Sequence, residues 1–137
     1  MNAYEPHVDV MRSHLGRVRG LGVGHSGAKH WWVERSSSVV LLPLSTWFVV
    51  QMFRLGGASR ADVIKWGGKP INATLLIALI ITTFYHARLG LQVIVDDYVH
   101  GHAYLPMRLL IKLGTFLLGL LGVISVVKLV IAHDSTK

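Results

Sequence analysis

The chain has 137 residues, of which 52% are apolar and 15% are charged, whereas soluble domains carry about 25% charged residues. This length fits one domain, and the clustering of the apolar residues excludes an ordinary soluble helical protein, whose helices need polar faces. The basic residues that give the chain its formal charge of +7 flank the apolar runs. Lipid headgroups or a partner protein are therefore favoured over nucleic acid as their binding partners. The absence of cysteine excludes disulfides and iron–sulfur ligation within the chain.

The beginning of the chain is basic and rich in glycine, and it has no apolar core, so it is not a secretory signal peptide. We interpret residues 1–29 as a flexible tail that anchors the chain to lipid or docks onto a soluble partner. Residues 30–137 then form one membrane-spanning domain. Trp31 and Trp32 stand at its entrance, where aromatic pairs usually mark the level of the lipid headgroups.

Three apolar runs follow, and each can supply the roughly 20 residues that cross about 30 Å of hydrocarbon. We expect transmembrane helices near 36–55, 71–98 and 106–131. The sequence therefore predicts an all-α integral membrane protein with three transmembrane helices. Gly56 and Gly57 should end the first helix, and a short interfacial helix is expected around residues 62–66.

The third helix carries small residues that should let neighbouring helices approach closely in lipid. They are Gly114, Gly119, Gly122 and Ser125. Pro106 suits the first turn of this helix, because its missing amide hydrogen is not needed there. Charge alone does not determine the orientation in the membrane, since basic residues flank both ends of the first helix.

His86 lies near the middle of the second expected helix, and an ionisable group at that depth is a functional hypothesis by default. Neutral imidazole is a common iron ligand, and haem can be bound between facing helices of a bundle. Gly90, one turn later on nearly the same face, would leave room for a flat macrocycle. The alternative is a histidine that is hydrogen-bonded to a neighbouring helix. No other histidine lies at comparable depth, so a bis-histidine haem would need its second ligand from another chain.

Arg88 is the second ionisable residue in this helix, and it lies about 200° around the helix axis from His86. A guanidinium at that depth needs an anion. A haem propionate is one candidate, and an acid or carbonyl group on a partner subunit is another. The alternative is an arginine that snorkels toward the membrane surface.

Asp97 and Tyr98 stand at the exit of the same helix. Asp97 follows His86 by eleven residues, so the two share one helix face about 16 Å apart along the axis. A phenol at the membrane boundary can donate a hydrogen bond to a quinone carbonyl, and a nearby carboxylate could orient it or help to deliver protons. The alternative is an ordinary helix end with an interfacial tyrosine.

Together these features resemble the small membrane-anchor subunit of succinate dehydrogenase (respiratory complex II), the cytochrome b556 small subunit family. The family pattern is a histidine in the second helix, then a small residue and a Gln-Val pair, then Asp-Tyr-Val. This chain reads His86-Ala87-Arg88-Leu89-Gly90-Leu91-Gln92-Val93 and then Asp97-Tyr98-Val99-His100-Gly101. Residues 30–36, His-Trp-Trp-Val-Glu-Arg-Ser, also resemble the family's entry to its first helix. The resemblance covers about residues 27–132.

The resemblance implies a three-helix anchor that packs as half of a heterodimeric haem-binding bundle with a large cytochrome b subunit. His86 would be one axial ligand of a haem b, and the large subunit would supply the other. Tyr98 would hydrogen-bond ubiquinone with Asp97 beside it, and Arg35 would lie near the quinone and the haem propionates. The role of Arg88 stays open.

The other partners that the resemblance implies are an iron–sulfur subunit and a flavoprotein subunit, and the location is a bacterial or mitochondrial-type inner membrane. The chain would carry out no catalysis alone, and electrons from succinate would reach quinone through the complex. Two alternative functions stay open. One is an anchor for a fumarate reductase or another quinone-linked oxidoreductase, and the other is a small transporter or channel subunit.

Overall fold

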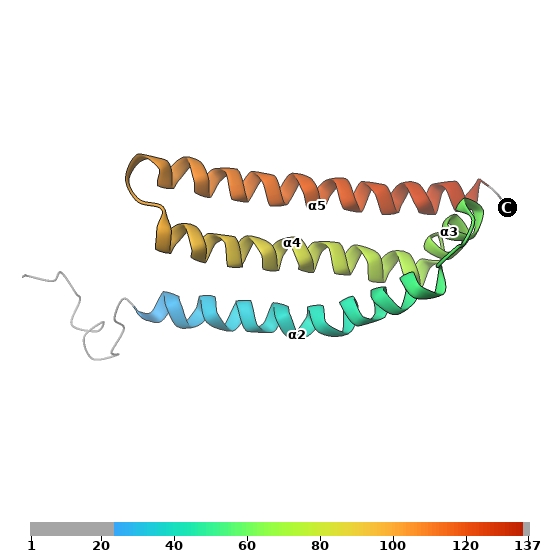
Figure 1. Cartoon of the computed structure of the whole chain (residues 1–137), viewed down its shortest axis with the longest axis horizontal. Coiled ribbons are helices and arrows are strands. Elements are labelled where there is room, and N and C mark those ends of the chain that lie inside the picture. The colour runs from blue at the N-terminus through green and yellow to red at the C-terminus, as the bar shows by residue number, and fades with distance from the viewer. Residues whose placement is uncertain (1–23, 136–137) are drawn as a thin grey trace, which may run out of the picture. The chain divides into compact units, whose positions relative to one another are not determined.

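The computed structural model describes residues 24–135 of the chain. Along them run the helices α2 (Gly24–Arg54), α3 (Arg60–Gly67), α4 (Pro70–Tyr98), the 3₁₀ turn η1 (Gly101–Ala103) and α5 (Tyr104–Asp134), as Figure 1 shows. The described residues contain no β-strand, which confirms the prediction of an all-α protein. The predicted tail over residues 1–29 lies mostly outside the described residues.

The chain divides into two compact units, residues 1–32 and residues 33–137. In the first unit the structure describes residues 24–32, which are helical, so α2 begins well before the expected start near residue 36. The indole rings of Trp31 and Trp32 meet edge to face there, with their centroids 5.1 Å apart. The fold and the candidate site described below lie in the second unit.

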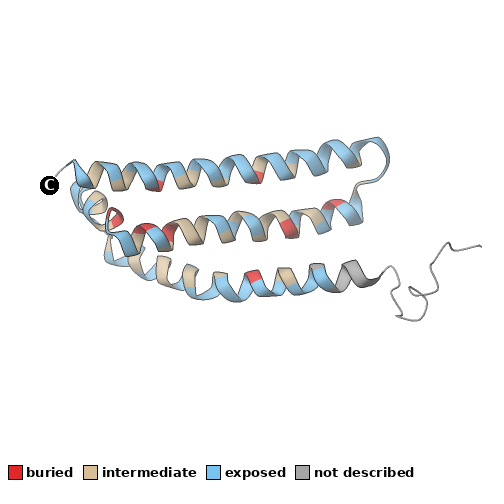
Figure 2. Ribbon diagram, turned by 180° about the vertical axis from the view of Figure 1, so that it is seen from behind, coloured by how far each residue is buried: buried red, intermediate tan, exposed pale blue. Residues whose placement is uncertain are grey.

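Within residues 24–135, three helical segments are long and apolar enough to cross a membrane. They are Trp31–Arg54, Pro70–Tyr98 and Gly101–Asp134, with mean hydropathy of 1.4, 1.5 and 2.4. Figure 2 shows that most of each long helix is exposed, with only scattered buried residues between the helices. Such exposed apolar surface suits a protein that is solvated by lipid or covered by partner subunits.

The connections between the helices follow the turn signals of the sequence. Helix α2 ends at Arg54, just before the Gly56-Gly57 pair that was predicted to end it, and Gly57 adopts a positive φ of 80° that favours glycine. Helix α3 begins with a capping box, in which Ser59 and Asp62 satisfy each other's backbone amides. This short helix covers the expected interfacial helix near residues 62–66. Pro106 falls in the first turn of α5, also as predicted.

A hydrophobic cluster of the second unit lies where α3 meets the long helices. The indoles of Trp47 and Trp66 stack with centroids 6.0 Å apart, and Trp66 Nε1 donates a hydrogen bond to Gln51 Oε1 at 3.2 Å. Asn72 Nδ2 donates to the carbonyl of Trp66 at 2.7 Å, which ties the start of α4 to α3. These polar contacts fix α2 and α4 to the same short helix.

Helices α4 and α5 pack antiparallel along their length (Figure 1). An added Cβ at Gly122 would lie 3.0 Å from the Ile80 side chain, and one at Gly119 would lie 3.5 Å from Phe84. The prediction of close packing at small residues is therefore confirmed for these two glycines. Gly114 meets no atom within 4 Å, so the small-residue surface is used over only part of its length.

Candidate functional site

The central feature of the candidate site is a hydrogen bond between α2 and α4. Ser37 Oγ lies 2.8 Å from His86 Nδ1. The Ser37 side chain is buried, with 8% of its surface exposed, and its hydroxyl also donates to the carbonyl of Glu34 at 2.7 Å. The alternative that the sequence left open for His86, a bond to a neighbouring helix, is thus present, and it involves Nδ1.

The two contacts of Ser37 together indicate which nitrogen of the neutral His86 ring carries the hydrogen. A serine hydroxyl has one hydrogen to donate, and the Glu34 carbonyl can only accept. Ser37 Oγ therefore accepts the second hydrogen bond, so His86 Nδ1 carries the hydrogen in neutral imidazole. The lone pair of this tautomer lies on Nε2. A ring held through Nδ1–H with Nε2 available is the usual arrangement of a metal-binding histidine.

The surroundings of His86 also bear on whether a large planar group fits beside it. Gly90 lies one turn further along α4, and a Cβ built there would meet no atom within 4 Å. The described residues contain no group of three or more His, Cys, Asp or Glu side chains that could hold a metal ion.

The other histidines of the sequence do not lie near the middle of a membrane helix as His86 does, where the structure describes them. His100 follows the last turn of α4, His102 belongs to η1, and His133 lies in the last turn of α5. His7 and His14 fall outside the described residues, as do the side chains of His25 and His30. Among the described side chains, His86 is thus the histidine that lies inside a long apolar helix away from its ends.

Arg35 lies two residues before Ser37 on α2, and its side chain is exposed. It therefore stands within about 3 Å of Ser37 along the helix axis, at a level close to that of His86. The family resemblance implied a place for Arg35 near a quinone and the haem propionates. Arg35 also lies about 200° around α2 from Ser37, so the structure places it near the level of His86 but on a different side of α2 from the Ser37 contact.

Arg88 is placed on a different side of α4 from His86. It lines a cavity between α4 and α5 together with Lys112, while His86 contacts Ser37 on α2. This separation agrees with the rotation of about 200° expected between the two positions. The structure therefore groups Arg88 with a second cation of α5 rather than with the imidazole.

Asp97 and Tyr98 occupy the last turn of α4, where the helix ends with the Val99 amide bonded to the Val95 carbonyl. Both side chains are exposed, and Tyr98 retains 80% of its surface. Because α4 is continuous from Pro70 to Tyr98, His86 and Asp97 share one helix face as predicted. A phenol exposed at a helix end is available to a ligand or to a partner subunit.

A hydrogen-bonded network of polar side chains beside this helix end was not predicted from the sequence. The Tyr104 hydroxyl donates to Asp96 Oδ1 at 2.8 Å and accepts from Arg108 Nη1 at 3.1 Å. This network joins the end of α4 to the start of α5 across the short turn η1. The spacing of four residues between Tyr104 and Arg108 was a detectable signal, but the pairing with Asp96 depends on how tightly the turn closes.

Comparison with known proteins agrees with the family resemblance seen in the sequence. Over residues 9–127 the chain matches the family described as the succinate dehydrogenase/fumarate reductase transmembrane subunit. The succinate dehydrogenase hydrophobic membrane anchor subunit of Rickettsia bellii (strain RML369-C) is 34% identical over 90 residues, which cover 64% of this chain and 70% of the relative. The protein of the same name from Paracoccus denitrificans is 30% identical over 84 residues, covering 61% and 65%. No solved structure matches the chain.

Proposed function

The chain belongs to the succinate dehydrogenase/fumarate reductase transmembrane subunit family, and we propose that it supplies one axial ligand of a haem b and part of a ubiquinone-reduction site. It is a multi-pass inner-membrane anchor, as its three apolar helices and its bacterial relatives indicate. An anchor of this kind associates with the other subunits of its enzyme and carries out no catalysis alone.

The observation that carries the haem proposal is the bond between Ser37 and His86. It leaves Nε2 of the neutral ring as the free base, which is the atom that would bind iron. The open space beside Gly90 supports the fit of a planar group on the same face. When bound, haem b supplies a reversible one-electron carrier. The protein's own contribution is to hold the imidazole in one orientation and one tautomer.

The second axial ligand is assigned to the large cytochrome b subunit. One histidine provides one ligand, and the described part of the chain offers no cluster of metal-binding side chains to provide another. Arg35 stands at a level close to that of His86, where its guanidinium could pair with a propionate. Arg88 is not assigned to the haem, because its side chain lines the cavity between α4 and α5.

The quinone site is proposed at the end of α4. Reduction of a quinone to a quinol takes up two electrons and two protons, so the site needs hydrogen-bond donors and a route for protons. The exposed Tyr98 phenol can donate to a quinone carbonyl, and Asp97 can take up and pass on protons beside it. The electrons would come from succinate through the flavoprotein and iron–sulfur subunits.

The adjacent hydrogen-bonded network of Asp96, Tyr104 and Arg108 holds the end of α4 and the start of α5 together beside this site. It orients the last turn of α4 without using Asp97 or Tyr98, so both remain available to quinone and to the partner subunits. In this arrangement Asp96 connects the two helices, whereas Asp97 and Tyr98 can serve the quinone.

An anchor for a fumarate reductase is the second candidate, because the matched family includes both enzymes. The curated relatives are named for succinate dehydrogenase, which favours the first candidate. The family match also favours an anchor over the channel or transporter subunit that the sequence left open.

The proposal is tested on the intact complex, purified from membranes that express this chain with its partner subunits. We expect flavin and iron–sulfur subunits to copurify and the reduced complex to show a b-type α-band. His86→Ala should remove that band, while His102→Ala in the exposed η1 turn should keep it. An unchanged band in His86→Ala would contradict the ligand assignment.

A further inference from the structure

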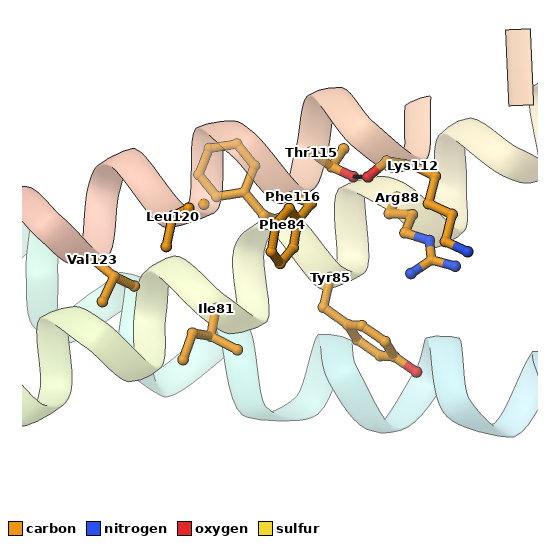
Figure 3. Close-up of a pocket in the computed structure, with 10 residues that line it drawn as sticks. Ile81, Phe84, Tyr85, Arg88, Lys112, Thr115, Phe116, Leu120 and Val123 are labelled. Carbon is orange, nitrogen blue, oxygen red and sulfur yellow. Dashed lines mark hydrogen bonds between the residues drawn. The ribbon is translucent and has the colours of Figure 1, made fainter. Parts of the chain in front are cut away.

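An apolar cavity of about 310 Å³ lies between α4 and α5. Figure 3 shows Ile81, Leu120 and Val123 at one end and the side chains of Arg88 and Lys112 together at the other. Thr115 also lines the cavity, but its hydroxyl donates to the backbone carbonyl of Ile111 at 2.7 Å. The cavity therefore combines a long apolar part with two cations at a single end.

A second cavity of about 310 Å³ shares Arg88 and Lys112 and adds Arg108. None of the described residues that line these two cavities is acidic. Arg108 has the neutral Tyr104 hydroxyl as its acceptor, and no carboxylate among residues 24–135 is bonded to Arg88 or Lys112. Like charges at one site repel unless an anion lies between them, so this end of the cavity is suited to an anion.

The antiparallel register places these two cations at one level of the membrane. Gly122 faces Ile80 and Gly119 faces Phe84, so further along the pair Lys112 comes to lie near Arg88. Residues 71–87 of α4 and 113–127 of α5 carry no charge, and they span roughly 25 Å and 22 Å along the helix axes. The hydrocarbon layer is about 30 Å thick, so the long side chains of Arg88 and Lys112 can reach from within it toward its edge.

We propose that this site binds the phosphate of an anionic phospholipid, with one acyl chain lying in the cavity between α4 and α5. The guanidinium of Arg88 can hold two phosphate oxygens at once, and the ammonium of Lys112 adds a point charge. Phosphate is the anion present at the hydrocarbon edge, and an acyl chain matches the apolar remainder of the cavity. The site is independent of the haem and quinone proposals, because it lies away from the side of α4 that contacts Ser37.

The experiment places a photoreactive benzoylphenylalanine at Phe116, which lines the cavity and is 65% exposed, in the intact complex. The complex is reconstituted into vesicles of equal parts phosphatidylglycerol and phosphatidylcholine, illuminated and analysed by mass spectrometry. We expect adducts with phosphatidylglycerol to exceed those with phosphatidylcholine about thirtyfold, because Arg88 and Lys112 both attract an anionic headgroup. The same probe at Leu118, which is exposed on α5 outside the cavity, should show no preference.

Three variants test whether the two cations cause that preference. Arg88→Gln with Lys112→Gln should abolish it, whereas Lys128→Gln on the same helix should leave it intact. Arg88→Lys with Lys112→Arg keeps both charges, so it should retain the preference and shows that loss in the first variant is not misfolding. Equal labelling by both lipids, or labelling unchanged in the double glutamine variant, would overturn the proposal. So would an adduct between Phe116 and another subunit, or removal of the preference by inorganic phosphate alone.

Discussion

Ser37 and His86 lie 49 positions apart in the chain, on α2 and α4, and their Oγ and Nδ1 atoms are 2.8 Å apart. The same hydroxyl donates to the Glu34 carbonyl one turn back in its own helix. A helix–helix contact is thereby linked to the tautomer of a histidine inside the membrane domain. This link gives the proposed haem site a supporting residue that lies outside the second-helix pattern on which the family resemblance depends.

Replacing Ser37 with alanine should weaken haem retention. The change removes the acceptor of His86 Nδ1–H, and loss of such a supporting contact typically costs 10- to 100-fold in metal affinity. The rate of haem release from the purified complex and the midpoint potential of the remaining haem measure the effect. Ser38→Ala is the matched control, because the Ser38 hydroxyl donates to the same Glu34 carbonyl but has no bond to His86.

Ser37→Thr should restore both readouts, since threonine keeps the hydroxyl. If Ser37→Ala releases haem at the rate of the unaltered complex and with the same potential, the bond to His86 does not support the ligand.

Replacing Gly90 with leucine should reduce the haem content of the complex. A side chain at Gly90 would enter space that is empty of protein atoms, one turn from His86, where the proposed macrocycle needs room. Gly114→Leu is the control, because Gly114 likewise meets no atom within 4 Å but lies on α5. The ratio of haem to flavin measures both variants. Equal ratios in Gly90→Leu and in the unaltered complex would place the haem away from this face.

Tyr98→Phe should lower quinone reductase activity roughly fivefold while haem content stays normal. The variant keeps the ring and loses a single hydrogen-bond donor, whose net contribution is on the order of 1 kcal/mol. Tyr85→Phe serves as the control, because Tyr85 is also partly exposed but lies in the middle of α4. Steady-state rates with a water-soluble quinone analogue and with a dye that accepts electrons before the membrane domain separate the two steps. Equal loss with both acceptors would assign the defect to assembly rather than to the quinone site.

The capping box of α3 should make this helix sensitive to acid. Hydrogen bonds from the Ser59 hydroxyl and amide hold the pKa of the Asp62 carboxyl below its ordinary value of 3.8. Because the folded-state pKa is the lower one, the carboxylate stabilises α3 above about pH 3.8, and this contribution is lost as the pH falls through the folded-state pKa. Hydrogen exchange of the amides of residues 60–68, corrected for intrinsic rates, should show that loss.

Ser59→Ala should remove most of this acid dependence and cost about 1 kcal/mol of local protection at neutral pH. Ser45→Ala is a suitable control, because its hydroxyl also donates to a backbone carbonyl but caps no helix. An acid response of α3 that is identical in Ser59→Ala and in the unaltered chain would show that another group is responsible.

The transmembrane helices could be predicted because their signal is local. Helix α4 was expected at 71–98 and spans 70–98, since a membrane helix satisfies its backbone within its own segment and needs only a sufficient apolar length. The glycine turn after α2 and the proline at the start of α5 were equally local. The start of α2 was missed, because residues 24–30 are not apolar enough to be recognised as a continuation of the spanning helix.

The contacts between helices could not be predicted in the same way. Nothing in the sequence pairs Ser37 with His86 or Tyr104 with Asp96, since each pair depends on the rotation and register of two packed helices. The roles of His86, Arg35, Tyr98 and Asp97 were inferred from a family pattern and stay predictions. Arg88 shows the difference most clearly, because its depth was evident from the sequence while its neighbour Lys112 was not.

By itself, the sequence determined that this protein is helical, that it crosses a membrane three times and that one helix carries an imidazole inside it and an acid–phenol pair at its end. The tertiary structure decided which atom of that imidazole is engaged and which side of α4 each charged residue faces. The physical reason is that hydrophobic length and backbone hydrogen bonding act within a segment. The direction of a side chain toward another helix is set by close packing between segments, and that depends on every residue at the contact.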